Sequence, residues 1–117
     1  MCAGVVDIVF AEMLNLASLD MSSNNLVSFP LGFFQHASGL LELDLTNNKI
    51  EALPTAVFVG MQLQNLTLAQ NQIHNLTTYP FHNLSNLQLL DLSDNLLDEV
   101  CHRTTERGVG YYKYERF

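Results

Sequence analysis

A spacing of leucines returns along most of the chain and limits the folds that are open to it. Between Leu40 and Ile50 the sequence reads LLELDLTNNKI, with leucine at positions one, four and six of a unit, asparagine at nine and isoleucine at eleven. The same pattern begins at Leu16, Leu63 and Leu87, so the units follow at intervals of 24, 23 and 24 residues. A period of roughly 20 to 30 residues predicts a stack of similar units rather than a closed globule.

Each unit is expected to contribute one short strand. Side chains alternate along a strand with a period of two, so the leucines at positions four and six share one face. A strand this short cannot bury that face alone, and the segment between strands is too long for a hairpin. Successive strands are therefore expected to lie parallel, about 4.8 Å apart, while the intervening residues return over the opposite side of a curved coil.

Two further positions predict how the units are joined. An amide is costly to bury unless its donors and acceptor are paired. The asparagines at position nine are therefore expected to form a ladder between the turns of neighbouring units: Asn24, Asn48, Asn71 and Asn95. Phenylalanines recur on the return path and are expected to stack as a spine: Phe10, Phe34, Phe58 and Phe81.

The register also divides the chain. Residues 1–15 hold a partial N-terminal repeat, residues 16–100 hold three full units and a partial fourth, and residues 101–117 form a divergent tail that is basic and rich in tyrosine. The frame is lost at Thr105, which stands where the fourth unit should have phenylalanine. The aromatic residues of the tail are expected to fold back over the last strand, around Leu90.

Charge and composition restrict the partners. The formal net charge is −7, and residues 1–100 carry ten acidic residues against a single basic one, Lys49. Nucleic-acid binding needs clustered Lys and Arg, so this acidic body argues against it and favours a basic protein or peptide. No run approaches the roughly 20 apolar residues of a membrane span. The scattered glycines form no nucleotide-binding fingerprint, so no cofactor is expected.

These positions resemble the leucine-rich repeat. The layout LxxLxLxxNxLxxLPxxxFxxL, read from Leu40, is similar to the typical class of about 24 residues found in extracellular proteins and Toll-type receptor ectodomains. The resemblance covers roughly Val5 to Val100. It implies an α/β fold, a right-handed solenoid with short parallel strands on the concave face and loops or short helical turns on the convex face. It also implies a non-enzymatic module that recognises a protein ligand on the concave face, outside the cell.

Two alternatives remain open. Extracellular members of this class usually have cysteine-rich caps, but Cys2 stands alone and Cys101 is followed by HRTTERGVGYYKYERF. The chain is therefore also consistent with a non-functional truncated fragment of a larger receptor. The missing caps also predict that the chain self-associates through its uncapped ends. An intracellular leucine-rich scaffold is the other alternative, because no signal peptide is visible at the N-terminus.

The residues that face outward from the strands are the candidate ligand-binding surface. They are Asp20, Ser22, Glu42, Asp44, Thr46, Asn65, Thr67, Asp91 and Ser93. The aspartates form a column that would suggest calcium, but Thr67 interrupts it, and calcium needs six to eight oxygen ligands around one point. No metal site is therefore predicted, and the simpler interpretation is that these aspartates are solvated residues of the repeat.

Three N-x-S/T acceptors favour an extracellular protein: Asn65, Asn75 and Asn83. All three lie outside the predicted core, where a glycan would not disturb the stacking. Chance is the alternative explanation, since repeats rich in Asn, Leu and Thr produce such acceptors. The histidines have no partners at the spacing of a zinc site or of a catalytic triad, so no enzymatic activity is predicted.

Overall fold

The computed structural model describes most of the repeat region and one short segment of the tail. The described residues are 16–30, 32–34, 36–76, 80–81 and 84–97, together with the backbone of 112–113. The predictions made for Cys2, Phe10, Asn83 and Cys101 lie outside them.

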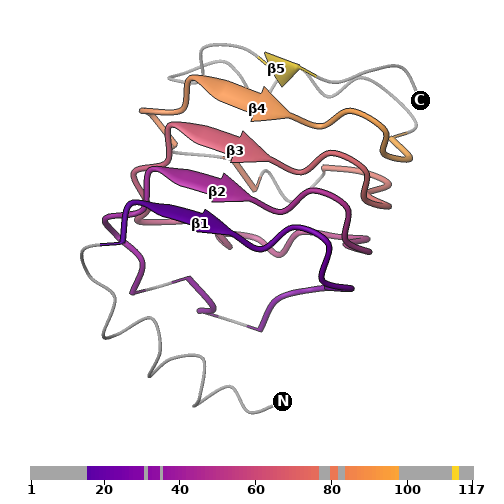
Figure 1. The fold of residues 1–117 in the computed structure, drawn as a ribbon, viewed down its shortest axis with the longest axis horizontal. Helices are drawn as coiled ribbons and strands as arrows, with labels where there is room; N and C mark the ends of the chain where they lie inside the picture. The colour runs from indigo at the N-terminus through magenta and orange to yellow at the C-terminus, as the bar shows by residue number, and fades with distance from the viewer. Residues whose placement is uncertain are drawn as a thin grey trace.

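One parallel sheet contains all the described strands, in the order in which they occur along the chain (Figure 1). The strands are β1 (Ser18–Asp20), β2 (Glu42–Asp44), β3 (Asn65–Thr67), β4 (Leu89–Asp91) and β5 (Tyr112–Lys113). The central leucines of the first four strands are register partners in succession: Leu19, Leu43, Leu66 and Leu90. Each strand is thus one turn of a solenoid, and the predicted fold class and register are confirmed.

The inward leucines form one continuous apolar layer beneath the sheet. Leu43, Leu66 and Leu90 are at most 2% exposed, and the leucines directly after β2, β3 and β4 are fully buried. Leu19 and Met21 in the first unit are only partly buried. The N-terminal unit is therefore less well covered than the units that follow it.

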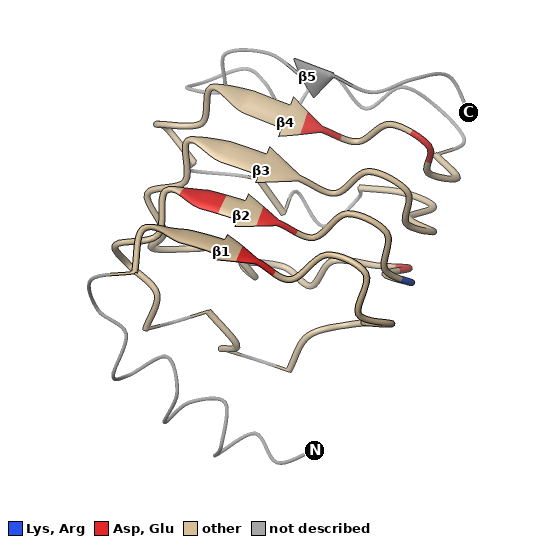
Figure 2. Cartoon of the chain, viewed as in Figure 1, with Lys and Arg blue, Asp and Glu red and all other residues tan. Residues whose placement is uncertain are grey.

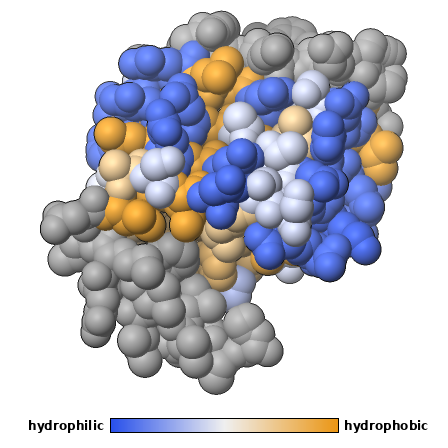
Figure 3. Space-filling view, in the orientation of Figure 1, coloured by the Kyte–Doolittle hydropathy of each residue, from blue (hydrophilic) through white to orange (hydrophobic). Residues whose placement is uncertain are grey.

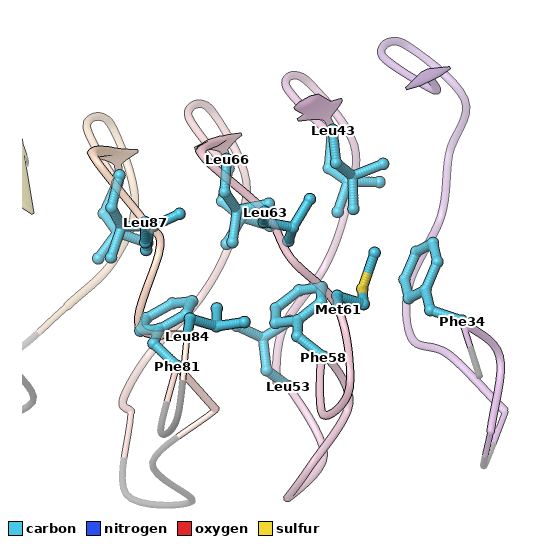
Figure 4. Packing of buried hydrophobic residues seen from close by; sticks show 14 of the residues in the cluster. Phe34, Leu43, Leu53, Phe58, Met61, Leu63, Leu66, Phe81, Leu84 and Leu87 are labelled. Carbon is cyan, nitrogen blue, oxygen red and sulfur yellow. The ribbon is translucent and has the colours of Figure 1, made fainter. Parts of the chain in front are cut away.

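The predicted phenylalanine spine lies behind this layer (Figure 4). Phe34, Phe58 and Phe81 are at most 1% exposed. The ring centroids of Phe34 and Phe58 are 5.8 Å apart, and those of Phe58 and Phe81 are 6.2 Å apart with an interplanar angle of 8°. The spine is confirmed for these three residues. Phe33, which is not part of the repeat pattern, adds an edge-on contact to Phe34 at 4.8 Å.

The return segments run behind the strands as successive turns (Figure 1). Backbone N–H groups of Ala37 and Met61 donate to the carbonyls of Phe34 and Phe58, three residues earlier, at 3.0 and 3.2 Å. Such i→i+3 bonds satisfy the backbone of a tight turn. The described return segments contain no helix, so the convex side is built there from turns, which is one of the two predicted options.

The residue before each ladder asparagine has a left-handed backbone conformation. Its φ is 58° at Ser23, 59° at Asn47, 58° at Gln70 and 58° at Asp94. Asn and Asp tolerate this region better than other residues with a Cβ atom. The bend takes the chain out of the strand and brings the next residue, the asparagine, under the turn. Sequence analysis did not predict it.

The structure adds a fifth strand within the segment that the sequence assigns to the tail. β5 lies parallel to β4, with Leu90 opposite Tyr112 and Asp91 opposite Lys113. The tail therefore reaches the last predicted strand by extending the sheet, a pairing that sequence analysis did not predict.

Candidate functional site: the strand face

The strand face is defined here as the outward side of β1 to β4 and of the two residues after each strand. All nine residues predicted to contact a ligand lie on it, and each is exposed or half-buried. The strand register aligns them in columns, and one column contains Asp20, Asp44, Thr67 and Asp91. Figure 2 shows acidic positions at the ends of β1, β2 and β4 but not of β3.

Asp44 is the carboxylate of this column that is hydrogen-bonded to a neighbouring strand among the described residues. Its Oδ1 accepts the backbone N–H of Thr46 at 3.0 Å and the hydroxyl of Thr67, on the next strand, at 2.8 Å. The Thr46 hydroxyl in turn donates to the Thr67 hydroxyl at 3.2 Å. These bonds join two adjacent strands on the outer side of the sheet.

The environment of Asp44 lowers the pKa of its carboxyl group. Burial is the largest single influence and by itself would raise the pKa, because it disfavours the charged form. The hydrogen bonds from Thr46 and Thr67 together outweigh burial, since they stabilise the carboxylate. Asp44 is thus held as an anion in a fixed orientation.

Asp20 and Asp91 repeat half of this arrangement. Oδ1 of Asp20 accepts the backbone N–H and hydroxyl of Ser22 at 2.9 and 2.6 Å. Oδ1 of Asp91 does the same with Ser93, at 3.0 and 2.7 Å. Each is a local turn in which a side chain bonds the backbone two residues on. The predicted solvated aspartates therefore also have a structural role, which sequence analysis missed although an Asp followed two residues later by Ser or Thr is its signature.

Within the described residues, every hydrogen bond to these three aspartates is accepted by Oδ1. The second oxygen, Oδ2, is bonded by none of those residues. The Oδ2 oxygens of Asp20, Asp44 and Asp91 are therefore held in a fixed orientation without being bonded by their own turns.

Glu42 and Asn65 form a second contact across the strands. The side-chain amide of Asn65 donates to Oε2 of Glu42 at 3.3 Å, and the two residues are register partners on β2 and β3. Leu89 follows in the same column on β4 and is half-buried. Figure 3, in the orientation of Figure 1, shows hydrophobic residues as a band between hydrophilic areas. The strand face is thus polar with an apolar element.

The two predicted glycosylation acceptors that the structure describes lie in different places. Asn65 is half-buried and stands in the middle of the strand face, whereas Asn75 is exposed on a return segment. A glycan on Asn65 would cover the centre of the strand face, while one on Asn75 would leave it open.

The described part of the chain has no group of three His, Cys, Asp or Glu residues arranged to hold a metal ion. Among the same residues, no helix has the length and apolar character needed to cross a membrane.

Comparison with known proteins identifies the repeats. A family model described as "Leucine rich repeat" matches residues 14–73 and 62–104. The chain belongs to the leucine-rich repeat family. Among similar curated proteins are mouse keratocan, 31% identical over 103 residues, and mouse Tsukushi, 33% identical over 87 residues. Human leucine-rich repeats and immunoglobulin-like domains protein 3 is 37% identical over 85 residues.

These alignments cover most of this leucine-rich repeat chain but little of its relatives. The keratocan alignment spans 86% of this chain and 29% of keratocan, and the Tsukushi alignment spans 73% and 25%. The alignment with human leucine-rich repeats and immunoglobulin-like domains protein 3 spans 73% of this chain and 8% of that protein. The similarity is therefore to a run of repeats inside longer proteins.

Proposed function

We propose that this leucine-rich repeat chain is a non-enzymatic recognition module that binds a protein ligand on the strand face. The observation that supports this proposal most directly is the alignment of nine polar side chains, on the three-residue strands and the residues that follow them, above a leucine layer that is buried beneath β2 to β4. The buried layer fixes the strands, so the outward side chains keep their spacing when a ligand arrives. Fixed side chains lose little conformational entropy on binding.

The ligand is proposed to be basic where it meets β1 and β2. Asp20, Glu42 and Asp44 lie on these two adjacent strands. The hydrogen bonds at Asp20 and Asp44 leave Oδ2 without a partner among the described residues. Oriented carboxylates of this kind favour Lys or Arg side chains, which form charge-assisted hydrogen bonds with them. Complementary charge also speeds association and excludes acidic proteins.

The proposed location is extracellular. The similarity to the typical repeat class of extracellular proteins and the exposed acceptor Asn75 both support this proposal. A glycan at Asn65 and a ligand on the strand face would compete for the same surface. Ligand binding at the centre of the face therefore requires Asn65 to be unmodified, and Asn75 is the acceptor that we expect to be used.

Site-specific photo-crosslinking tests the position of the ligand. A photoreactive amino acid is placed at Thr67 on the strand face or, as the control, at Val59, which is 57% exposed on a return segment. Each variant is exposed to proteins secreted by cultured cells, and the crosslinked products are identified by mass spectrometry. A product specific to Thr67 is expected, and a product that forms equally at Val59 would contradict the strand face as the site.

Neutral substitutions test the charge of the ligand. The variant with Asp20→Asn, Glu42→Gln and Asp44→Asn keeps the shapes of the side chains and removes three charges. It should lose most of the Thr67 crosslink. The control, Glu51→Gln, removes a charge from an exposed residue on a return segment and should crosslink as the unmodified chain does. Equal crosslinking by the triple variant would show that the ligand is not held by these carboxylates.

We also propose that the chain self-associates through the edge of β1. Among the described strands, β1 is paired only with β2, at one end of the sheet. An unpaired strand edge is a template for another chain.

A further inference from the structure

A group of side-chain amides lies where β3 and β4 begin. We call it the carboxamide cluster, and its members are Gln62, Gln64, Asn65, Asn86 and Gln88. Gln64 and Asn65 are half-buried, and the other three are exposed. Figure 3 shows a hydrophilic area on the side of the molecule where these strands begin. None of the five side chains carries a charge, whereas the aspartate column lies at the other end of the strands.

Contacts between the two strand starts hold the cluster together. The side-chain nitrogen of Asn86 donates to Oε1 of Gln62 at 2.7 Å. The backbone N–H groups of Gln88 and Leu89 both donate to the carbonyl of Gln64, at 2.8 and 3.1 Å. Neighbouring strands are about 4.8 Å apart, so Gln64 and Gln88 place their side chains next to one another.

Much of the hydrogen-bonding capacity of the cluster is unused. The side-chain amides of Gln64 and Gln88 are bonded to none of the described residues. The amide nitrogen of Gln62 and the amide oxygen of Asn86 also have no partner among these residues. A carboxamide offers two N–H donors and an oxygen that accepts two bonds. The cluster therefore presents donors and acceptors together to a molecule that approaches it.

We propose that the carboxamide cluster binds a neutral oligosaccharide. A sugar hydroxyl donates one hydrogen bond and accepts two. Neighbouring hydroxyls of one ring therefore match the donor and the acceptor that one carboxamide presents in its plane. The spacing of about 4.8 Å between strands is close to the length of one hexose ring, so Gln64 and Gln88 reach successive rings of a chain that lies across the strands. This inference does not rest on the proposed protein ligand.

Leu89 gives the cluster an apolar side. It is half-buried, follows Gln88 in the chain and is the register partner of Asn65. Contact between Leu89 and the C–H groups of a sugar ring removes apolar surface of both from water. Binding sites for small molecules combine such apolar surface with a few placed polar groups. The net charge of −7 disfavours sulfated or sialylated sugars, so a neutral oligosaccharide fits best.

An extended polypeptide is the alternative occupant of the cluster. Its main chain would also bond to carboxamides. Selective binding of an extended peptide, however, uses pockets or charges that recognise its side chains. The five side chains of the cluster provide no charge, and Leu89 is the apolar residue beside them. An oligosaccharide is recognised through its hydroxyl groups, which amides bond directly, and the cluster therefore favours it.

A printed oligosaccharide array tests the proposal. The array carries neutral, sialylated and sulfated oligosaccharides, and the labelled full chain is applied to it. Neutral oligosaccharides should retain the chain, and the acidic ones should not. The neutral oligosaccharide that retains it best is then titrated in solution by NMR. Failure of every neutral oligosaccharide to bind, or binding of the sulfated ones alone, would overturn the proposal.

Methionine substitutions test the position of the site, because methionine keeps the length of glutamine and lacks its amide. Gln64→Met/Gln88→Met should weaken binding of that oligosaccharide at least about tenfold, the effect of losing one or two hydrogen bonds. The matched control is Gln70→Met/Gln72→Met, which removes two exposed amides outside the cluster and should bind as the unmodified chain does. Equal losses in both variants, or no loss in the first, would refute the cluster as the site.

Two further measurements keep the outcomes distinct. If Gln64→Met/Gln88→Met melts at a lower temperature than the unmodified chain, Gln88→Met alone replaces it, because Gln88 is exposed. That variant should bind several-fold more weakly at an unchanged melting temperature, and unchanged binding would refute the site. The Thr67 crosslink separates this inference from the proposed function. A crosslink without array binding would refute the oligosaccharide site alone, whereas array binding without a crosslink would contradict only the protein ligand.

Discussion

The side-chain oxygen of Asn48 accepts the backbone N–H of Leu26, in the preceding repeat, at 3.0 Å. The same oxygen accepts the N–H of Asn24 at 2.9 Å, and the amide nitrogen of Asn48 donates to the carbonyls of Met21 and Leu45 at 3.1 and 3.0 Å. One amide thus closes the turns of two repeats. Asn71 and Asn95 make equivalent bonds and, like Asn48, are 6% exposed.

Replacement of Asn48 should destabilise the whole stack. Asn48→Ala leaves buried backbone groups without partners, so the free energy of unfolding should fall by about 1–3 kcal/mol. Asn24→Ala is the matched control, because Asn24 is exposed and, among the described residues, its amide donates only within its own repeat, to Met21 and Ser22. Urea denaturation followed by circular dichroism measures both. Equal losses would mean that the ladder does not act between repeats.

The ladder and the spine could be predicted from the sequence because they follow from its period. A buried asparagine that returns every 23 or 24 residues has few partners except the turns of its neighbours, and a phenylalanine with the same period must stack on its counterparts. The buried positions of Asn71 and Phe58, for example, follow from the register of the repeats alone.

The missed features depend on local geometry or on weak sequence signals. The left-handed conformation at Ser23 and Gln70 is imposed by the stacked turn. Neither serine nor glutamine favours a positive φ, so the sequence gives no sign of it. The bonds from Thr46 and Thr67 to Asp44 depend on how the side chains of β2 and β3 are oriented across the sheet. The sequence pattern does not contain that orientation, so it predicts only solvated aspartates. β5 was missed because tyrosine stands in place of leucine.

A charge placed in the leucine layer should unfold the chain as one unit. Leu66 is fully buried at the centre of β3, so Leu66→Asp buries a carboxylate without a partner, at a cost of several kcal/mol. That is comparable to the total stability of a small domain. A thermal melt should lose its cooperative transition. The control Gln72→Asp, at an exposed position, should melt within about 3 °C of the unmodified chain.

The cooperative melt also bears on the alternative that the chain is a non-functional fragment. An unmodified chain that melts gradually at all temperatures, with or without Leu66→Asp, would favour that alternative over a recognition module.

The hydrogen bonds at Asp44 should make stability depend on pH. The pKa of its carboxyl group is lower in the folded chain than the ordinary value of 3.8. The folded state therefore binds the proton less tightly than the unfolded state does. The stabilisation is fully present above about pH 5 and is lost as the pH falls through 3.8 toward the folded pKa.

Melting temperatures between about pH 7 and pH 2.5 check this dependence. Asp44→Asn should melt at a lower temperature at pH 7 and should lose less of its stability on acidification than the unmodified chain. Asp94→Asn, which removes an exposed carboxylate from the turn after β4, is the matched control and should keep the slope of the unmodified chain. Parallel curves for Asp44→Asn and the unmodified chain would contradict the role of these bonds.

The left-handed residue of the third repeat offers a stabilising substitution. Gln70 has a φ of 58°, whereas the equivalent position of the second repeat is Asn47 with 59°. Asparagine tolerates this conformation better, so Gln70→Asn should raise the free energy of unfolding by about 0.5–1 kcal/mol. The matched control is Gln72→Asn, two residues away at an exposed position without a positive φ. No gain at Gln70, or an equal gain at Gln72, would show that the backbone there is not strained.

The edge of β1 allows a test of self-association. The N–H groups of Met21 and Ser23 donate to Asp44 and Thr46 on the β2 side, and because N–H groups alternate in direction, that of Ser18 points to the open edge. Proline is tolerated at the first residue of a strand and has no N–H to offer. Light scattering at about 50 μM should show association of the unmodified chain and of the control Ser18→Ala, and a larger monomer fraction for Ser18→Pro with a similar melting temperature. If the unmodified chain is a monodisperse monomer, or if Ser18→Pro associates as strongly as Ser18→Ala, the edge of β1 is not the surface through which the chain assembles.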